Sequence, residues 1–181
     1  KTFNKALSLV NSQPQAAHKL LSCLTANVIK YCSAQIEAGA DAIMLFDSHG
    51  GKLANNQYDD FSLQYLANII KVIKSVYPQV PIIVYGLLDT ERAIKLASIK
   101  PDVLGVSHLA DLALVRKKVA ANIVLQGNID PGLLSQSDSG LVVDATKKCI
   151  NEHAGFAGIV NLGHGIKPDA RIDQVKLMLK T

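Results

Sequence analysis

The sequence contains no tryptophan, only three cysteines and no stretch of about 18 consecutive apolar residues. Cys23, Cys32 and Cys149 lack C-x-x-C spacing, which argues against a disulfide framework and a zinc knuckle and favours a reducing compartment. The lack of a long apolar run predicts no membrane-spanning helix. Lysine and arginine are scattered rather than gathered in a basic stripe with aromatics, so nucleic-acid binding is not expected.

Composition places the chain among ordinary globular domains. Of its 181 residues, 49% are hydrophobic and 19% are charged, which supports one domain with its own core and is far from disorder. We therefore expect a single domain over residues 1–181. The net charge of +4 suits an anionic ligand, but a solvated surface explains it equally well. No secretory signal is visible, and because the first residue is Lys1 rather than Met, we expect a fragment or a processed product.

Helical and strand patterns alternate along the chain. Apolar residues at helical spacing predict helices over 15–38, 61–76, 90–98, 110–119, 141–153 and 168–180. Short apolar runs bounded by glycine or proline predict strands over 41–46, 81–85, 103–106, 123–126 and 157–162. This order is typical of a parallel α/β sheet covered by helices. An open doubly wound sheet and part of a closed (β/α)8 barrel both fit.

Polar and glycine-rich segments follow three of the predicted strands, at 47–51, 126–131 and 161–165. Polar groups at the carboxyl ends of parallel strands can converge on one ligand, so we expect a pocket at that edge. Their wide spread over several strands favours the barrel, because an open sheet gathers its ligand at one switch point. A full barrel takes about 250 residues, so five units would be an incomplete one.

Ser48 is a candidate ligand contact rather than a catalytic nucleophile. The adjacent Asp47, Ser48 and His49 cannot face one another as a triad, and no G-x-S-x-G elbow is present. Asp47 could equally serve as a carboxylate bonded to nearby backbone amides. Gln126, Asn128 and Asp130 could read a polar ligand or simply fix their loop.

Among the histidines, His164 is the preferred ligand contact because it ends a strand between two glycines. His108 ends another strand and is a weaker candidate. A three-histidine metal site with His49 is conceivable but lacks H-x-H or H-E-x-x-H spacing. His18 and His153 lie on predicted helices and are expected to be exposed. Cys23 and Cys32 are expected to be small buried residues of a helix.

Four segments resemble the uroporphyrinogen decarboxylase family. They are FDSHGGKL (46–53), FSLQY (61–65), LQGNIDP (125–131) and NLGHGIKPD (161–169), in the family's order. The resemblance implies a parallel (β/α)8 TIM-type barrel of which this chain holds about the last five β/α units. It also implies that the chain is the C-terminal half of the family's sequence.

The resemblance further implies a function. The family removes the acetate side chains of uroporphyrinogen III, giving coproporphyrinogen III in porphyrin and heme biosynthesis, without metal or cofactor. Ser48 and His164 match its substrate-binding positions. Its arginine-rich loop, and an aspartate and a tyrosine presented to substrate, belong to the half absent here. The resemblance therefore implies no catalytic residue in this chain, inactivity of the fragment alone, and a cytoplasmic homodimer for the full-length protein.

Two segments depart from the family's pattern. Residues 84–88 (VYGLL) lack an expected lysine, and 106–108 (VSH) replace Leu-Asp-Trp, so the substrate could differ. One alternative is a cobamide-dependent methyltransferase of the same superfamily, although its His-x-Cys pair is missing. The other is a non-catalytic tetrapyrrole-binding module. A part-barrel leaves sheet edges and an apolar interior exposed, so we expect self-association or a missing partner segment.

Overall fold

The computed structural model describes residues 3–153 and 155–181 and contains one five-stranded parallel sheet. Its strands are β1 (Ile43–Asp47), β2 (Ile82–Gly86), β3 (Val103–Gly105), β4 (Val124–Gln126) and β5 (Gly158–Ile159). They lie side by side in chain order, β1-β2-β3-β4-β5. A doubly wound sheet would reverse its strand order at a switch point. The unreversed order is that of a barrel wall, so the chain forms five β/α units of a TIM-type barrel.

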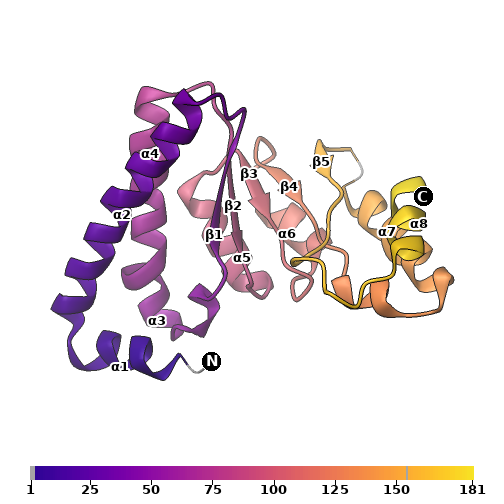
Figure 1. Ribbon diagram of the computed structural model, residues 1–181, viewed down its shortest axis with the longest axis horizontal. Helices are drawn as coiled ribbons and strands as arrows, with labels where there is room; N and C mark the ends of the chain where they lie inside the picture. The colour runs from indigo at the N-terminus through magenta and orange to yellow at the C-terminus, as the bar shows by residue number, and fades with distance from the viewer. Residues whose placement is uncertain (1–2, 154) are drawn as a thin grey trace.

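Helices precede and follow every strand (Figure 1). The α-helices are α1 (Asn4–Ser12), α2 (Pro14–Glu37), α3 (Asn55–Tyr58), α4 (Gln64–Val76), α5 (Thr90–Leu96), α6 (Leu112–Lys118), α7 (Ser139–Glu152) and α8 (Ile172–Lys180). Short 3-10 segments are η1 (Gly50–Lys52), η3 (Ala97–Ile99) and η4 (Pro131–Ser135), and η2 (Asp59–Leu63) is a π-helical turn. Figure 1 shows α1 to α4 at one end of the molecule, α7 and α8 at the other, and the strands between them.

The hydrophobic core lies between the sheet and its helices. Side chains alternate across a strand, and those on the helix-facing side, such as Val84, Leu104 and Leu125, are completely buried. The opposite side corresponds to the barrel interior and is partly open. Phe46 on that side is 65% exposed, which is where a closed barrel would place further side chains.

All six predicted helices and all five predicted strands are present, with shifted ends. Asp89 caps α5 by accepting a hydrogen bond from the Arg92 amide at 2.9 Å. Asp111 likewise caps α6, which delays its start. The last strand is two residues long instead of six. Helix α1 is not among the helices predicted from the sequence, and it lacks a capping side chain.

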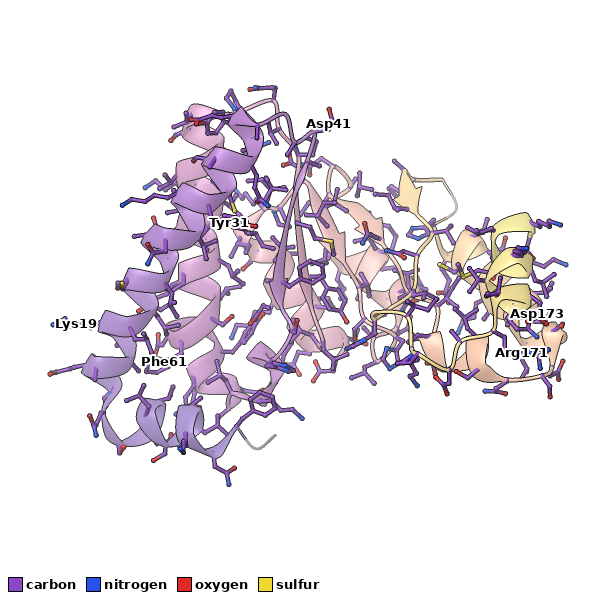
Figure 2. All side chains as sticks on the ribbon, in the orientation of Figure 1. Lys19, Tyr31, Asp41, Phe61, Arg171 and Asp173 are labelled. Carbon is purple, nitrogen blue, oxygen red and sulfur yellow. The ribbon has the colours of Figure 1, made fainter. Side chains whose placement is uncertain are left out.

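Three expectations about helical residues are wrong. Cys23 is exposed, whereas Cys32 on the same helix is buried as expected. His153 is buried rather than exposed, and its Nε2 lies 3.2 Å from the Gly127 carbonyl oxygen. His18 is half-buried because its ring stacks on Phe61 at 4.4 Å, at the end of α2 where Figure 2 labels Phe61. His153 and His18 pack against segments that lie elsewhere in the sequence, and the periodicity of their own helices does not describe such contacts.

Arg116 of α6 closes the turn that leads into β4. Its buried guanidinium donates to the carbonyls of Ile123 (2.8 Å), Val119 (3.0 Å) and Ala120 (2.6 Å). It also lies over the Phe156 ring at 4.7 Å. An arginine is well suited to this role because one planar group carries five donors.

We predict that Arg116→Met lowers the free energy of unfolding by about 3 kcal/mol, because three carbonyls lose a charged donor. Chemical denaturation of the full-length protein measures the change. The matched control is Lys117→Met, an exposed neighbour whose loss should change stability by no more than about 0.5 kcal/mol. Equal effects of the two substitutions would contradict this role of Arg116.

Candidate functional site

The candidate site lies at the carboxyl edge of the parallel sheet, where the predicted polar segments follow their strands. Residues 47–51 follow β1, residues 126–131 follow β4, and residues 161–165 follow β5. Loops after β2 and β3 lie between them because the strands are in chain order. The three polar segments therefore lie along one edge of the sheet, which is the edge where we expect the pocket.

Ser48 is half-buried directly after β1. It lines a cavity of about 190 Å³ together with Asp89 from the loop after β2, Arg92 from α5 and Leu109 from the loop after β3. Within residues 3–153 and 155–181 its hydroxyl takes part in no hydrogen bond, which leaves it available to a ligand. His164 lies outside the lining of this cavity.

Asp47 is a structural carboxylate of this loop, although its partner is not the predicted backbone amide. Its Oδ2 accepts a hydrogen bond from the Ser62 hydroxyl at 2.6 Å. The carboxylate covers Gly50 so closely that a Cβ at residue 50 would lie 1.9 Å from Oδ2. Tyr58 is completely buried nearby, and burial together with the negative charge of Asp47 raises the pKa of its phenol. The loop after β1 is thus fixed from beneath.

Arg92 of α5 also fixes the loop after β1, a role not predicted from the sequence. Its guanidinium donates to the carbonyls of Gly51 and Leu53, the latter at 2.9 Å, and to Asn55 Oδ1 at 2.6 Å. An arginine within a helix gives no sequence signal for such a contact, because its partners lie about 40 residues earlier.

His164 is exposed. It follows β5, whereas Ser48 follows β1, the strand at the opposite end of the sheet. The segment before it continues the pairing of β4 with β5. The Gly163 amide donates to Ile129 O at 2.7 Å, and the Ile129 amide donates to Asn161 O at 3.0 Å. The backbone leading to His164 is therefore held while the imidazole faces solvent.

His108 and Tyr85 approach this segment from β3 and β2. The ring centroids of His108 and His164 are 6.3 Å apart, with the rings nearly perpendicular. The Tyr85 hydroxyl donates to Gly163 O at 2.9 Å. Tyr85 was not a predicted site residue, because nothing in an apolar strand sequence marks one tyrosine as reaching a carbonyl 78 positions later.

The three predicted strand-end histidines do not meet. His108 and His164 are neighbours, but His49 packs against Phe3, with ring centroids 4.5 Å apart. Among the residues that the structure describes, no group of three His, Cys, Asp or Glu side chains is placed to hold a metal ion.

Asn128 and Asp130 fix their loop, the second of the two roles considered for them. The Asn128 amide donates to Ser107 O at 3.0 Å and to Ala110 O at 2.7 Å. Asp130 Oδ1 accepts a hydrogen bond from the Gly132 amide at 2.7 Å. Gln126 is buried in the inner face of the sheet.

In the described part of the chain, no helix is both long and apolar enough to cross a bilayer.

Comparison with known proteins gives one family. The family model described as uroporphyrinogen decarboxylase (URO-D) matches residues 1–181. Relatives named uroporphyrinogen decarboxylase include one from Legionella pneumophila (strain Lens), 37% identical over 99% of this chain and 51% of its own length. Another, from Vesicomyosocius okutanii subsp. Calyptogena okutanii (strain HA), is 34% identical over 99% of this chain and 52% of its own length. The chain spans about half the length of the curated relatives it matches.

Among solved structures, a Schiff-base-forming fructose-1,6-bisphosphate aldolase gives a TM-score of 0.49 at 14% identity, covering 81% of this chain and 59% of the aldolase chain.

We predict that Arg92→Gln loosens the loop after β1, because two backbone carbonyls lose their charged donor. Amide hydrogen exchange over residues 50–55 should rise, and the free energy of unfolding should fall by about 2 kcal/mol. The control is Lys95→Gln on the same helix, which removes an exposed ion pair with Asp59 and should change stability by less than about 1 kcal/mol. Unchanged exchange over 50–55 in the Arg92 variant would refute the assignment.

Proposed function

The chain belongs to the uroporphyrinogen decarboxylase family, and we propose that the protein containing it converts uroporphyrinogen III to coproporphyrinogen III by removing four acetate carboxyl groups. The observation that carries the proposal is the family match over residues 1–181. The reaction is a step of porphyrin and heme biosynthesis. The substrate would bind at the carboxyl edge of the sheet.

The chemistry needs an acid and a stabilised cation. Protonation of a pyrrole carbon creates a cation next to the acetate arm. The bond to the carboxylate then breaks, CO2 leaves, and its electron pair neutralises the cation. A proton added to the resulting methylene carbon gives the methyl group, and loss of the ring proton restores the pyrrole. The substrate is its own electron sink, so the reaction requires no metal or organic cofactor.

Ser48 and His164 supply positioning in this scheme. A hydroxyl and an imidazole can each donate a hydrogen bond to a carboxylate arm, and fixed arms orient the ring for protonation. Both side chains are accessible at the strand ends. Groups that stabilise the pyrrole cation and bind the other carboxylates would come from the rest of the barrel. The 181-residue chain is therefore a single-domain C-terminal part of the enzyme, inactive by itself.

Two surfaces of the chain, the edge of β1 and one face of α2, are consistent with contacts to the rest of a barrel. β1 pairs only with β2 among the described residues, so its other edge is open. On α2, Leu20, Leu24 and Tyr31 are 49%, 49% and 67% exposed, and their spacing places them along one helical face. Figure 2 marks Tyr31 on α2. The preceding β/α units of a barrel would pair with β1 and cover this face.

A cobamide-dependent methyltransferase is not favoured. Those enzymes resemble the decarboxylase in fold but hold zinc with a His-x-Cys pair and a distant Cys at strand ends. Here all three cysteines lie on helices α2 and α7. Burial raises the pKa of the Cys32 and Cys149 thiols, which disfavours the thiolate that binds metal. A non-catalytic tetrapyrrole-binding module would bind substrate without turnover, and the assay below distinguishes it.

From the family we also propose a cytoplasmic homodimer for the full-length protein, with no nucleic-acid partner. The net charge of +4 comes from scattered residues, which fits a small anionic substrate better than a nucleic acid.

We predict that Ser48→Ala and His164→Ala in the full-length protein each lower kcat/KM for uroporphyrinogen III about tenfold, because each removes one contact to a carboxylate. Porphyrin products separated after oxidation measure the turnover. The control is Ser75→Ala, which removes an exposed hydroxyl bonded only to Val72 O and should leave kcat/KM unchanged. Full activity of both site variants would refute their assignment to substrate binding, and absence of turnover in the parent protein would refute the function.

We predict that the isolated 181-residue chain is inactive and self-associates, because the β1 edge and the α2 face are uncovered. Light scattering after size exclusion measures the mass of the chain, and the same turnover assay measures its activity. Adding the complementary half of the protein should restore activity and suppress the association. A monomeric chain that decarboxylates uroporphyrinogen would contradict both parts.

A further inference from the structure

The carbonyl oxygen of Gly163, the residue before His164, accepts hydrogen bonds from side chains and backbone of two other β/α units. We propose that Tyr85 and His108 form a clamp on this carbonyl that sets the orientation of the His164 imidazole. They are positioning residues that act through His164. The inference rests on the proposed function only for what His164 touches, since the clamp itself is a property of the fold.

Tyr85 is the first arm of the clamp. It lies on β2 with its ring in the barrel interior, where Phe46 meets it at 6.0 Å between centroids. Gly105 is its register partner on β3, and a Cβ at residue 105 would lie 3.0 Å from the Tyr85 Cβ. The strand thus leaves space for the ring, which reaches Gly163 O at 2.9 Å. Burial raises the pKa of the phenol, so it stays protonated and able to donate.

His108 is the second arm. Its backbone amide donates to Gly163 O at 3.3 Å, and its Nδ1 lies 3.3 Å from the same oxygen, where it donates in the Nδ1–H tautomer. The approach is so close that a Cβ at residue 163 would lie 2.2 Å from the His108 nitrogen. Glycine is therefore required at residue 163 by contact rather than by backbone angle.

Fixing this carbonyl fixes the start of His164. The peptide bond is planar, so holding Gly163 O also holds the amide nitrogen of His164 in the same plane. Gly165 follows His164, and a Cβ built on Gly165 would have no neighbouring atom within 4 Å. A histidine between two glycines has unusually free backbone on both sides. The clamp removes that freedom on the Gly163 side. The His108 ring, whose centroid lies 6.3 Å from that of His164, occupies one side of the imidazole.

The test uses the full-length protein and Tyr85→Phe, which removes only the hydroxyl. We expect faster amide exchange over residues 162–165 and a threefold to tenfold lower kcat/KM, the effect of one neutral hydrogen bond. In a His164→Ala background the same substitution should lower kcat/KM no further. The control is Tyr77→Phe, which removes a hydroxyl bonded to Glu37 Oε1 at 2.7 Å and should change neither measurement.

A second pair of variants keeps the test decisive if Tyr85→Phe folds poorly. His108→Asn can present an amide donor near the position of Nδ1 and should retain activity, whereas His108→Ala should lose as much as Tyr85→Phe. Equal losses with and without the His164 imidazole, or unchanged exchange over 162–165, would overturn the clamp. A parent protein without turnover would overturn the proposed function, and the exchange measurement would still decide the clamp.

Discussion

Parallel pairing of β1 to β5 in chain order is the constraint on which the rest of the structure depends. It places the end of every strand at one edge, so loops separated by more than 100 residues in the sequence meet there. It also assigns each strand residue to a face: Val84, Leu104 and Leu125 pack under the helices, while Phe46 and Tyr85 face the barrel interior. A one-residue change of register would exchange the two sets. The strand order and register therefore determine the geometry of the candidate site.

Side chains that donate hydrogen bonds to backbone carbonyls fix the loops between the strands and helices. Arg116 binds the turn before β4, Arg92 binds the loop after β1, and Asn128 binds the loop after β3. Each satisfies carbonyls that lie outside regular pairing and would otherwise be costly to bury. Because these residues fix the loops, the side chains of Ser48 and His164 are not needed for that purpose and can contact a ligand. A loop with polar, uncommitted side chains on a fixed backbone is what ligand binding requires.

Periodicity predicted the helices, the strands and the edge at which the polar segments gather, because these depend on residues close together in the sequence. It overestimated β5, since Leu162 pairs with Ile129 as an isolated bridge after an interruption. It failed for His153 and Cys23, whose burial depends on what packs against a helix from elsewhere. Tyr85 was missed for the same reason. Its partner is 78 positions away, and a tyrosine in an apolar strand is equally well explained as core.

The two segments that depart from the family's pattern gain a common explanation from the fold. Tyr85 stands in one and His108 in the other, yet both donate to a single oxygen. Because they share a partner, a change at either residue alters what the other must supply, and such pairs are expected to be coupled energetically. The departures then need not signal a different substrate. In the proposed clamp, Tyr85 and His108 together hold the segment 161–165 and the imidazole that it presents.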